Sequence, residues 1–180
     1  MVGPVSSFRG KPASPSGRRP VSILFVCTGN ICRSPLAEYL LRDYASRQGK
    51  AHLIEVSSAG THAWDGNAAT GEARAAGRKW RLDLSGHRAR EVRRPVIDAS
   101  DFILAMTRSH HDWLAREFPE RKNRLYLALL FPRRLDDNSS AATDVPDPIG
   151  ESVGFYLDVL DMLAPALPVI LSAALGEETV

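Results

Sequence analysis

A cysteine and an arginine are separated by five residues near the start of the chain, in the segment CTGNICR at residues 27–33. An apolar run precedes this segment and a Ser-Pro pair follows it, as where a strand passes through a loop into a helix. In such a loop, successive backbone N–H groups can point inward and bind an anion, assisted by the positive end of the helix dipole. The guanidinium of Arg33 can close over a phosphate through two parallel hydrogen bonds. We therefore interpret residues 27–33 as a phosphate-binding loop.

Cys27 is the candidate nucleophile of this loop. An ordinary thiol with a pKa of about 8.5 is only ~3% thiolate at pH 7, but helix N-termini and nearby cations raise the thiolate fraction of a cysteine. A thiolate facing a bound phosphorus atom can attack it, and the hydroxyl of Ser34 can donate a hydrogen bond to that sulfur. A buried cysteine at the end of a strand is the simpler alternative, but the loop between strand and helix favours catalysis.

The remaining residues of the loop suit a tight backbone around an anion. Gly29 accepts backbone angles that other residues avoid. Asn30 tolerates the left-handed region and can bond to neighbouring backbone groups. The residues we assign to phosphate binding are Thr28, Gly29, Asn30, Ile31, Cys32, Arg33 and Ser34.

A carboxylic acid must supply a proton to the oxygen that leaves the phosphorus. Asp147 stands in a polar segment and precedes Pro148, which restricts it to an extended backbone. The same side chain could instead cap the last helix, and Asp144 is an alternative acid without a following proline. We expect Asp147 to donate the proton and then to activate water against the phosphocysteine.

Runs of β-branched and apolar residues alternate with segments of helical spacing along the chain. Strands are predicted at residues 21–26, 52–58, 101–106 and 124–127, and helices at 34–47, 67–80 (broken near Gly77), 109–118 and 149–163. This alternation is typical of a parallel sheet covered by helices on both faces, a three-layer α/β fold. Ligands bind such sheets at the carboxyl ends of the strands, where the loop at 27–33 lies. His110 and His111 are expected on a helix surface.

Composition narrows the class of protein. The chain has 180 residues, 44% of them hydrophobic, a net charge of +2 and two cysteines. These values predict one globular domain at residues 21–180 and exclude a disulfide scaffold or a Cys-rich zinc site. We expect no cofactor, no metal and no nucleic acid. We also expect no membrane span, since the apolar stretch at 164–175 is short and interrupted by Pro165 and Pro168.

Residues 1–20 are rich in arginine, lysine, proline and serine, and predict a flexible basic extension. Such an extension is either without function or an electrostatic tether to an acidic partner. It contains no apolar core of a secretory signal, so a cytoplasmic location is expected. The arginines at 88, 90, 93 and 94 form a basic cluster, either a solvated face or an attraction for phosphopeptides.

Five motifs together resemble the low-molecular-weight protein tyrosine phosphatases. They cover about residues 21–165 and are LFVCTGNICRSP at 24–35, SSAGT at 57–61, LSGHRAR at 84–90, DFILAMT at 101–107 and VPDPIG at 145–150. The resemblance implies a small doubly wound α/β fold with a four-stranded parallel sheet. It also implies a phosphocysteine intermediate, phosphorylated proteins as substrates and partners (a tyrosine kinase among them), and phosphate or sulfate in the site.

The resemblance assigns roles residue by residue. It implies that Cys27 is the nucleophile, Arg33 the phosphate-binding arginine and Asp147 the general acid. Loop support falls on Asn30, Ser34 and His87, the histidine bonding the asparagine of the loop.

The resemblance implies two further roles, each with a structural alternative. The family's second cysteine can trap an oxidised nucleophile as a disulfide, a role that would fall on Cys32, which is otherwise a small buried residue. The family places an aromatic residue in the wall of the substrate cleft, a role that would fall on Trp64, which is otherwise a packed tryptophan.

Phosphotyrosine is the first choice of substrate. Protein arginine phosphatases share the loop but carry threonine where this chain has Ile31, which favours tyrosine. The mammalian family members have an aromatic pair after Asp-Pro, whereas this chain has Ile149 and Gly150, which keeps phosphoarginine as the alternative. An arsenate reductase would need a further cysteine after Cys32. A catalytically idle phosphate-binding module is disfavoured by intact Cys27, Arg33 and Asp147.

Overall fold

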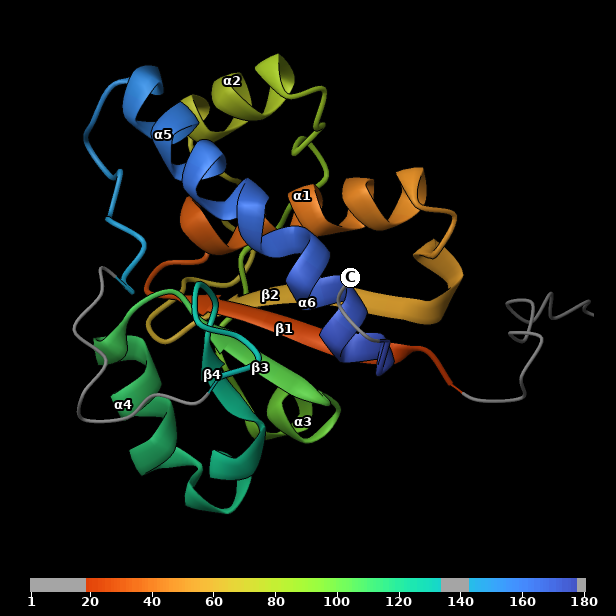
Figure 1. Cartoon of the computed structure of the whole chain (residues 1–180). Coiled ribbons are helices and arrows are strands. Elements are labelled where there is room, and N and C mark those ends of the chain that lie inside the picture. Colours follow the sequence, from red (N-terminus) through yellow and green to blue (C-terminus); the bar gives the residue numbers. More distant parts are fainter. Residues whose placement is uncertain (1–18, 134–142, 178–180) are drawn as a thin grey trace, which may run out of the picture.

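Four parallel strands form the middle layer of the molecule in this computed structural model, which describes residues 19–133 and 143–177. They are β1 (Val21–Cys27), β2 (Ile54–Gly60), β3 (Phe102–Ala105) and β4 (Leu125–Leu127). Their order across the sheet is β2-β1-β3-β4, and each neighbouring pair is parallel. The expected four-stranded parallel sheet is confirmed (Figure 1).

Helices cover both faces of this sheet (Figure 1). One face carries α1 (Arg33–Arg47), α2 (Gly71–Lys79), α5 (Val153–Leu163) and α6 (Leu167–Leu175), and the other carries α3 (Arg94–Asp98) and α4 (Arg108–Glu117). Short 3₁₀ turns occupy Ala51–Leu53, Pro119–Arg124 and Ala164–Ala166. The predicted three-layer doubly wound fold is therefore confirmed.

The alternation of side chains along β1 separates two hydrophobic cores. Ile23 and Phe25 belong to the core under α1, α2, α5 and α6, whereas Leu24 and Val26 belong to the core under α3 and α4. Successive residues of a strand point to opposite faces, so an unbroken apolar run can fill both cores. The unbroken apolar run therefore fits the prediction of a strand that is buried on both faces.

Some predicted boundaries were wrong. The helix predicted from residue 67 begins at Gly71, where the Thr70 hydroxyl caps it by accepting from the N–H of Ala73. It is not broken at Gly77, where the absence of a side chain lets the following residues pass close to the helix. A Cβ there would lie 2.7 Å from Leu84 Cδ1. The helix predicted from residue 149 begins only at Val153, and α3 and α6 were not predicted.

The C-terminal helical run is longer and more continuous than the sequence suggested. Val153–Leu175 forms 23 helical residues whose most apolar window has a mean hydropathy of 1.7, enough by length and composition to cross a membrane. Pro165 and Pro168 do not interrupt it, because both lie in first turns where no N–H is needed. Its buried side chains pack in the same core as α1 and α2, and a helix at the core of a folded domain has this composition too.

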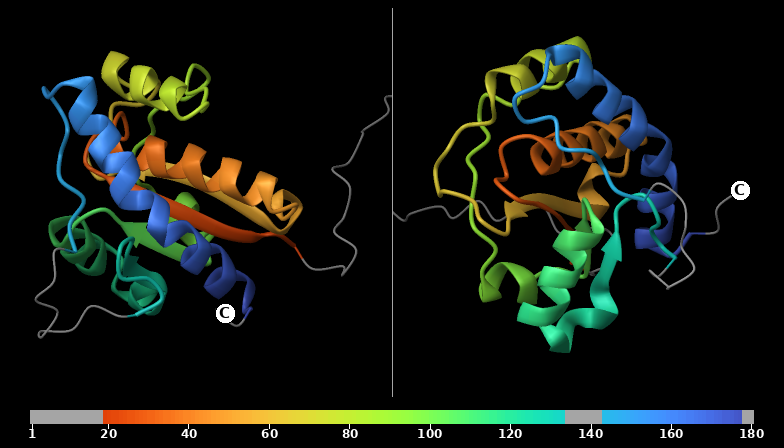
Figure 2. Two further views of the ribbon diagram at one scale, coloured as in Figure 1. Left: turned by 45° about the horizontal axis from the view of Figure 1, so that its top comes forward. Right: turned by 90° about the vertical axis from the view of Figure 1, so that its left-hand side faces the viewer.

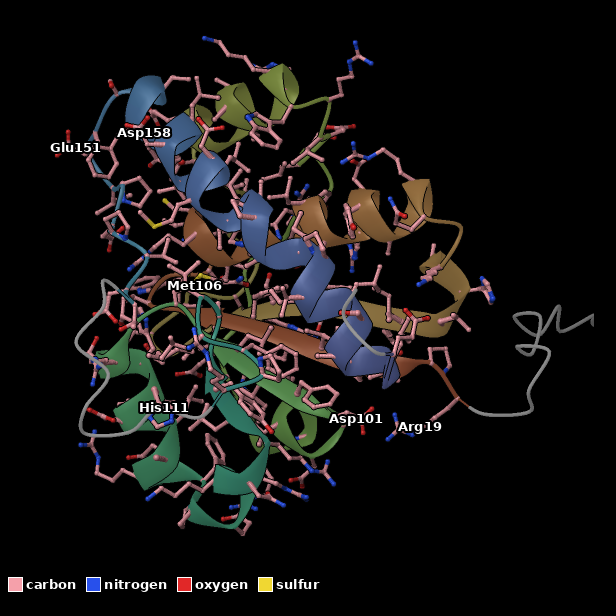
Figure 3. All side chains as sticks on the ribbon, in the orientation of Figure 1. Arg19, Asp101, Met106, His111, Glu151 and Asp158 are labelled. Atoms are coloured by element: carbon pink, nitrogen blue, oxygen red, sulfur yellow. The ribbon has the colours of Figure 1, made fainter. Side chains whose placement is uncertain are left out.

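The two ends of the sheet differ in chemistry. At the amino ends of the strands, Arg19 forms an ion pair of 2.7 Å with Asp101, and the two side chains lie together in Figure 3. The Arg19 guanidinium lowers the pKa of the Asp101 carboxyl, whose oxygen also accepts from the N–H of Ser22. The end of the predicted extension is thus tied to the sheet, while residues 1–18 lie outside the described residues, as do 134–142 of the predicted loop and 178–180 of the predicted domain.

The carboxyl ends of the strands gather four segments that are distant in sequence. Figure 2 (right) looks onto this end, where the loop after β1, the loop after β2, the start of α4 and the segment before α5 meet. Met106, just after β3, lies at this end in Figure 3. The predicted phosphate-binding loop is one of these four segments, so the candidate site lies where parallel sheets usually bind ligands.

Candidate active site

In the phosphate loop, residues 27–33, the backbone carbonyl groups point outward and accept hydrogen bonds from the surrounding structure. Five of them accept hydrogen bonds from other segments: Cys27 from Thr61 N (2.9 Å), Thr28 from His62 N (3.0 Å), Asn30 from His87 Nε2 (2.7 Å), Ile31 from Thr70 N (2.9 Å) and Cys32 from Leu36 N (3.2 Å). In a trans peptide the next N–H points the opposite way from the carbonyl. The N–H groups therefore point into the loop, the arrangement that binds anions.

No acceptor within the described residues takes the N–H groups of residues 28–32. Backbone N–H groups away from water are nearly always paired in folded proteins. A phosphate in the loop would satisfy several of them at once.

Asn30 holds the loop from within. It has a positive φ of 53° and is fully buried. Its side-chain amide donates to the hydroxyls of Ser34 (2.9 Å) and Ser58 (2.8 Å), and its side-chain oxygen accepts from the backbone N–H of Arg90 (2.9 Å). With the polar groups of its side chain bonded on both ends, Asn30 fixes the left-handed turn that the loop requires.

Cys27 ends β1 and is buried with its sulfur 3.0 Å from the hydroxyl oxygen of Ser34. The sequence predicted a contact between the Ser34 hydroxyl and this sulfur, and the structure places the two atoms together. The helix that the Ser-Pro pair marks, α1, begins one residue earlier, at Arg33. Ser34 accepts from Asn30, so its own hydrogen can be donated either to the Cys27 sulfur at 3.0 Å or to the Ala59 carbonyl at 3.4 Å. The hydroxyl is thus placed to stabilise a thiolate.

Arg33 is buried, with 4% of its surface exposed, and its guanidinium is only partly satisfied. One terminal nitrogen donates to an Asp147 carboxylate oxygen at 2.6 Å and the other to the carbonyl of Val145 at 3.3 Å. Its Nε–H is buried and has no partner among the residues that the structure describes. An unsatisfied buried donor costs about 1–3 kcal/mol, so this N–H is a ready donor for a phosphate oxygen.

Asp147 lies beside Arg33 at the edge of the site, and its side chain is 45% exposed. It does not cap the last helix, because α5 begins at Val153 after Ser152. Its second oxygen accepts from the N–H of Ile149 at 3.2 Å. The alternative acid, Asp144, is used elsewhere: it accepts from the N–H of Arg108 at the start of α4, at 2.8 Å.

Two histidines support the phosphate loop, and only one was expected. His87 bonds the backbone carbonyl of Asn30, and burial lowers its pKa. His110 was expected on a helix surface, but it is 6% exposed and lies 2.8 Å from the Thr28 hydroxyl through Nε2. Burial, and then the Arg33 charge, lower the pKa of His110 to about 4. The missed signal was the four-residue spacing from Leu114, which shares the buried face of α4.

Cys32 occupies a different environment from Cys27. Both are free thiols, but the Cys32 sulfur lies 3.3 Å from the Tyr156 hydroxyl and 3.8 Å from that of Thr70. Burial raises the pKa of the Cys32 thiol. Cys32 therefore stays protonated at neutral pH and does not compete as a nucleophile.

Two segments next to the phosphate loop and the acid carry large, exposed apolar side chains. Trp64, in the loop after β2, is 79% exposed, and Ile149, two residues after Asp147, is 54% exposed. Trp64 is therefore not a packed core residue. The predicted basic cluster is mostly paired rather than free: Arg90 donates to the Ser58 carbonyl, and Arg93 and Arg94 form ion pairs with Asp65 and Glu120.

Gly60, at the end of β2, was not singled out from the sequence, although it lies in the SSAGT motif. A Cβ at this position would overlap the carbonyl oxygen of Thr28 and lie 2.9 Å from the nitrogen of Asn30. Only glycine lets the phosphate loop pass this close to β2. The nearest signal was the Gly itself at the end of a strand, which often marks a close approach of backbones.

Gly60→Ala is expected to displace the phosphate loop. We expect affinity for inorganic phosphate to fall at least ~10-fold and the free energy of unfolding to fall by about 1–3 kcal/mol through overpacking. Calorimetric titration and urea unfolding measure the two effects. Gly71→Ala is the control, since a Cβ there meets no atom within 4 Å. Unchanged phosphate affinity in Gly60→Ala would contradict the proposed role of this contact.

The two buried histidines predict a loss of stability on mild acidification. The pKa values of both histidines are lowered in the folded state. Below the ordinary histidine pKa of about 6.5, the unfolded chain therefore binds more protons than the folded chain. This proton binding lowers the free energy of unfolding. We expect His110 to contribute a loss of roughly 1 kcal/mol per pH unit between pH 6.5 and 5.

Urea unfolding of wild type and His110→Asn across pH 5–9 tests this. The wild-type free energy of unfolding should fall more steeply below pH 6.5, while the two slopes agree above pH 7.5. Parallel curves throughout would show that His110 titrates normally.

Comparison with known proteins agrees with this geometry. Residues 22–180 match the family described as low molecular weight phosphotyrosine protein phosphatase. A protein-arginine-phosphatase of Geobacillus stearothermophilus is 33% identical over 144 residues, 80% of this chain and 89% of the relative. A low molecular weight protein-tyrosine-phosphatase of Streptomyces coelicolor is 34% identical over 155 residues, 84% and 92% of the two chains.

A solved structure supports the same assignment. The tyrosine phosphatase Wzb from Escherichia coli K30, in complex with sulphate, has a TM-score of 0.71 at 29% identity and covers 84% of this chain and 96% of its own. Fold, motifs and relatives agree on the class of reaction, and the relatives divide between tyrosine and arginine as the phosphorylated residue. The chain belongs to the low molecular weight phosphotyrosine protein phosphatase family.

Proposed function

We propose that this phosphatase hydrolyses phosphotyrosine in proteins through a phosphocysteine on Cys27, with Asp147 as general acid and base. The observation that carries the proposal is the combination of inward N–H groups and an unpaired, buried Arg33 Nε–H around one sulfur. A phosphate dianion supplies the acceptors that all these donors lack.

Binding of the phosphate is expected to change the partners of Arg33. In the resting site its terminal nitrogen holds the Asp147 carboxylate at 2.6 Å. The phosphate offers Arg33 two oxygens for a parallel pair of hydrogen bonds, which is the geometry a guanidinium prefers. Asp147 is then released toward the leaving-group oxygen, beside a dianion that favours its protonated form.

The reaction follows in two steps. The Cys27 thiolate attacks phosphorus, the bond from phosphorus to the tyrosine oxygen breaks, and protonated Asp147 gives its proton to that oxygen. The Asp147 carboxylate then takes a proton from water, the water oxygen attacks phosphorus and the sulfur–phosphorus bond breaks. Ser34, 3.0 Å from the sulfur, stabilises Cys27 both as nucleophile and as leaving group.

Apolar residues around the site favour an aromatic leaving group. Ile31 in the loop is half-buried and apolar, and the exposed Trp64 and Ile149 lie in the two segments that adjoin the loop and the acid. A tyrosine ring gains by covering such side chains, whereas a guanidinium needs polar partners. We assign Trp64 to the wall of the substrate cleft.

Arginine phosphatase activity is the alternative. A relative at 33% identity is named a protein-arginine-phosphatase, and Ile149-Gly150 stands where an aromatic pair would grip a tyrosine. Ile31 argues against it, since the arginine phosphatases resembled here carry threonine at that place.

Turnover of p-nitrophenyl phosphate tests the catalytic assignment. Cys27→Ser is expected to abolish measurable activity, and Asp147→Asn to lower kcat/KM by ~10²–10⁴-fold, the range for loss of a general acid. Asp144→Asn is the matched control: this carboxylate accepts from the N–H of Arg108 at the start of α4, and its loss should lower kcat/KM only severalfold. An inert wild type that still binds phosphate would refute the enzyme assignment.

Peptide substrates test the specificity. We expect wild type to prefer phosphotyrosine over phosphoarginine peptides, and Ile31→Thr to shift the ratio of the two kcat/KM values toward phosphoarginine by ~10-fold, the effect of about one hydrogen bond. A wild-type preference for phosphoarginine would reverse the proposal and leave the phosphocysteine mechanism intact.

A further inference from the structure

The buried imidazole of His110 joins the phosphate loop to the start of α4. Its Nε2 lies 2.8 Å from the hydroxyl oxygen of Thr28, and its Nδ1 lies 2.7 Å from that of Thr107. Thr107 caps α4 and accepts from the backbone N–H of His110 at 3.3 Å. Both ring nitrogens are thus occupied, and the catalytic steps above use neither.

The start of α4 also anchors the segment that carries the acid. The Asp144 carboxylate accepts from the N–H of Arg108 at 2.8 Å, and the N–H of Val145 donates to the carbonyl of Met106 at 2.8 Å. The carbonyl of Val145 in turn accepts from Arg33. One short stretch, residues 106–110, therefore contacts the phosphate loop on one side and the approach to Asp147 on the other.

The charges around His110 come from three segments. Arg33 and His62 disfavour its protonation, whereas Asp144 and Asp147 favour it, and burial is the largest effect. With a pKa of about 4 the ring is neutral at physiological pH. A neutral imidazole has one donor and one acceptor nitrogen, which suits a bridge between two hydroxyl groups.

We propose that His110 is a positioning residue of the phosphatase reaction: its neutral ring fixes Thr28 against the start of α4 and so holds the nucleophile loop in register with Asp147. This inference rests on the proposed phosphocysteine mechanism. Thr28 is the first residue after Cys27, and its carbonyl is already held by His62. Without His110, nothing within the described residues bonds the Thr28 side chain.

A wrong placement of the nucleophile loop relative to Asp147 changes kcat/KM differently for different leaving groups, which a loss of stability does not. Misplacing Asp147 impairs proton delivery to the leaving oxygen, which matters more for a weakly acidic phenol than for a strongly acidic one. Phenyl phosphate, whose phenol resembles tyrosine with a pKa of about 10, should therefore suffer more than p-nitrophenyl phosphate. A partly unfolded enzyme would lose the same fraction of activity toward both substrates.

The variants approach the contact from both sides. His110→Asn removes the nitrogen that reaches Thr28, Thr28→Val removes the hydroxyl while keeping the shape, and the double variant measures their coupling. His111→Asn is the matched control, because this neighbour on α4 (Figure 3) bonds Asp112 instead of the loop. Each protein is measured for kcat/KM with both substrates and for thermal unfolding.

We expect kcat/KM of His110→Asn to fall ~3-fold with p-nitrophenyl phosphate and ~10-fold or more with phenyl phosphate. The double variant should be no worse than the poorer single variant, and Thr28→Ser should retain more activity than Thr28→Val. His111→Asn should match wild type.

Equal losses with both substrates, or additive effects of the two single variants, would overturn the proposal. If His110→Asn does not fold, Thr28→Val and Thr28→Ser still test the contact, because equal activity of these two variants would refute it. A wild type inactive toward both substrates would instead refute the proposed function.

Discussion

The inward orientation of the N–H groups in the phosphate loop is the constraint on which the rest of the structure depends. A backbone can present several donors to one point only if its carbonyls find partners outside. Here those partners come from the loop after β2, the turn before α2, the first turn of α1 and His87. Gly60 and the positive φ of Asn30 allow the loop to fit among them. Much of the fold around the strand ends can be understood as support for this one loop.

In the site without phosphate, the hydrogen-bonding groups of Arg33 are only partly satisfied. Arg33 and Asp147 pair at 2.6 Å, yet no group in the described part of the chain accepts from the buried Nε–H of Arg33. In the proposed mechanism, a phosphate that takes over Arg33 satisfies that N–H and frees Asp147 in the same event. The proposal thus links substrate binding and activation of the acid through one guanidinium, while Ser34 and Asn30 hold the surroundings of the sulfur.

Features set by local sequence were predictable, and features set by the approach of distant segments were not. The apolar run at the start of the domain predicts the strand β1. The Cys-x5-Arg spacing predicts an anion-binding loop, and the Asp-Pro pair predicts an acid. The contact of Ser34 with the Cys27 sulfur was expected, whereas the hydrogen bond from the Asn30 side chain to the Ser34 hydroxyl was not. The environment of His110 depends on α4 packing against a loop about 80 residues earlier in the chain. Gly77 was predicted to break its helix, because the sequence does not show that Leu84 packs against it.

Capture of the covalent intermediate tests the central claim, that Cys27 receives the phosphoryl group. Asp147→Ala would be mixed with excess p-nitrophenyl phosphate, quenched in acid and digested, with peptide fragmentation that separates Cys27 from Cys32. One phosphoryl group on Cys27, absent from a Cys27→Ser control treated identically, is the predicted result. Release of p-nitrophenol with the phosphoryl group on another residue, or on none, would contradict the account.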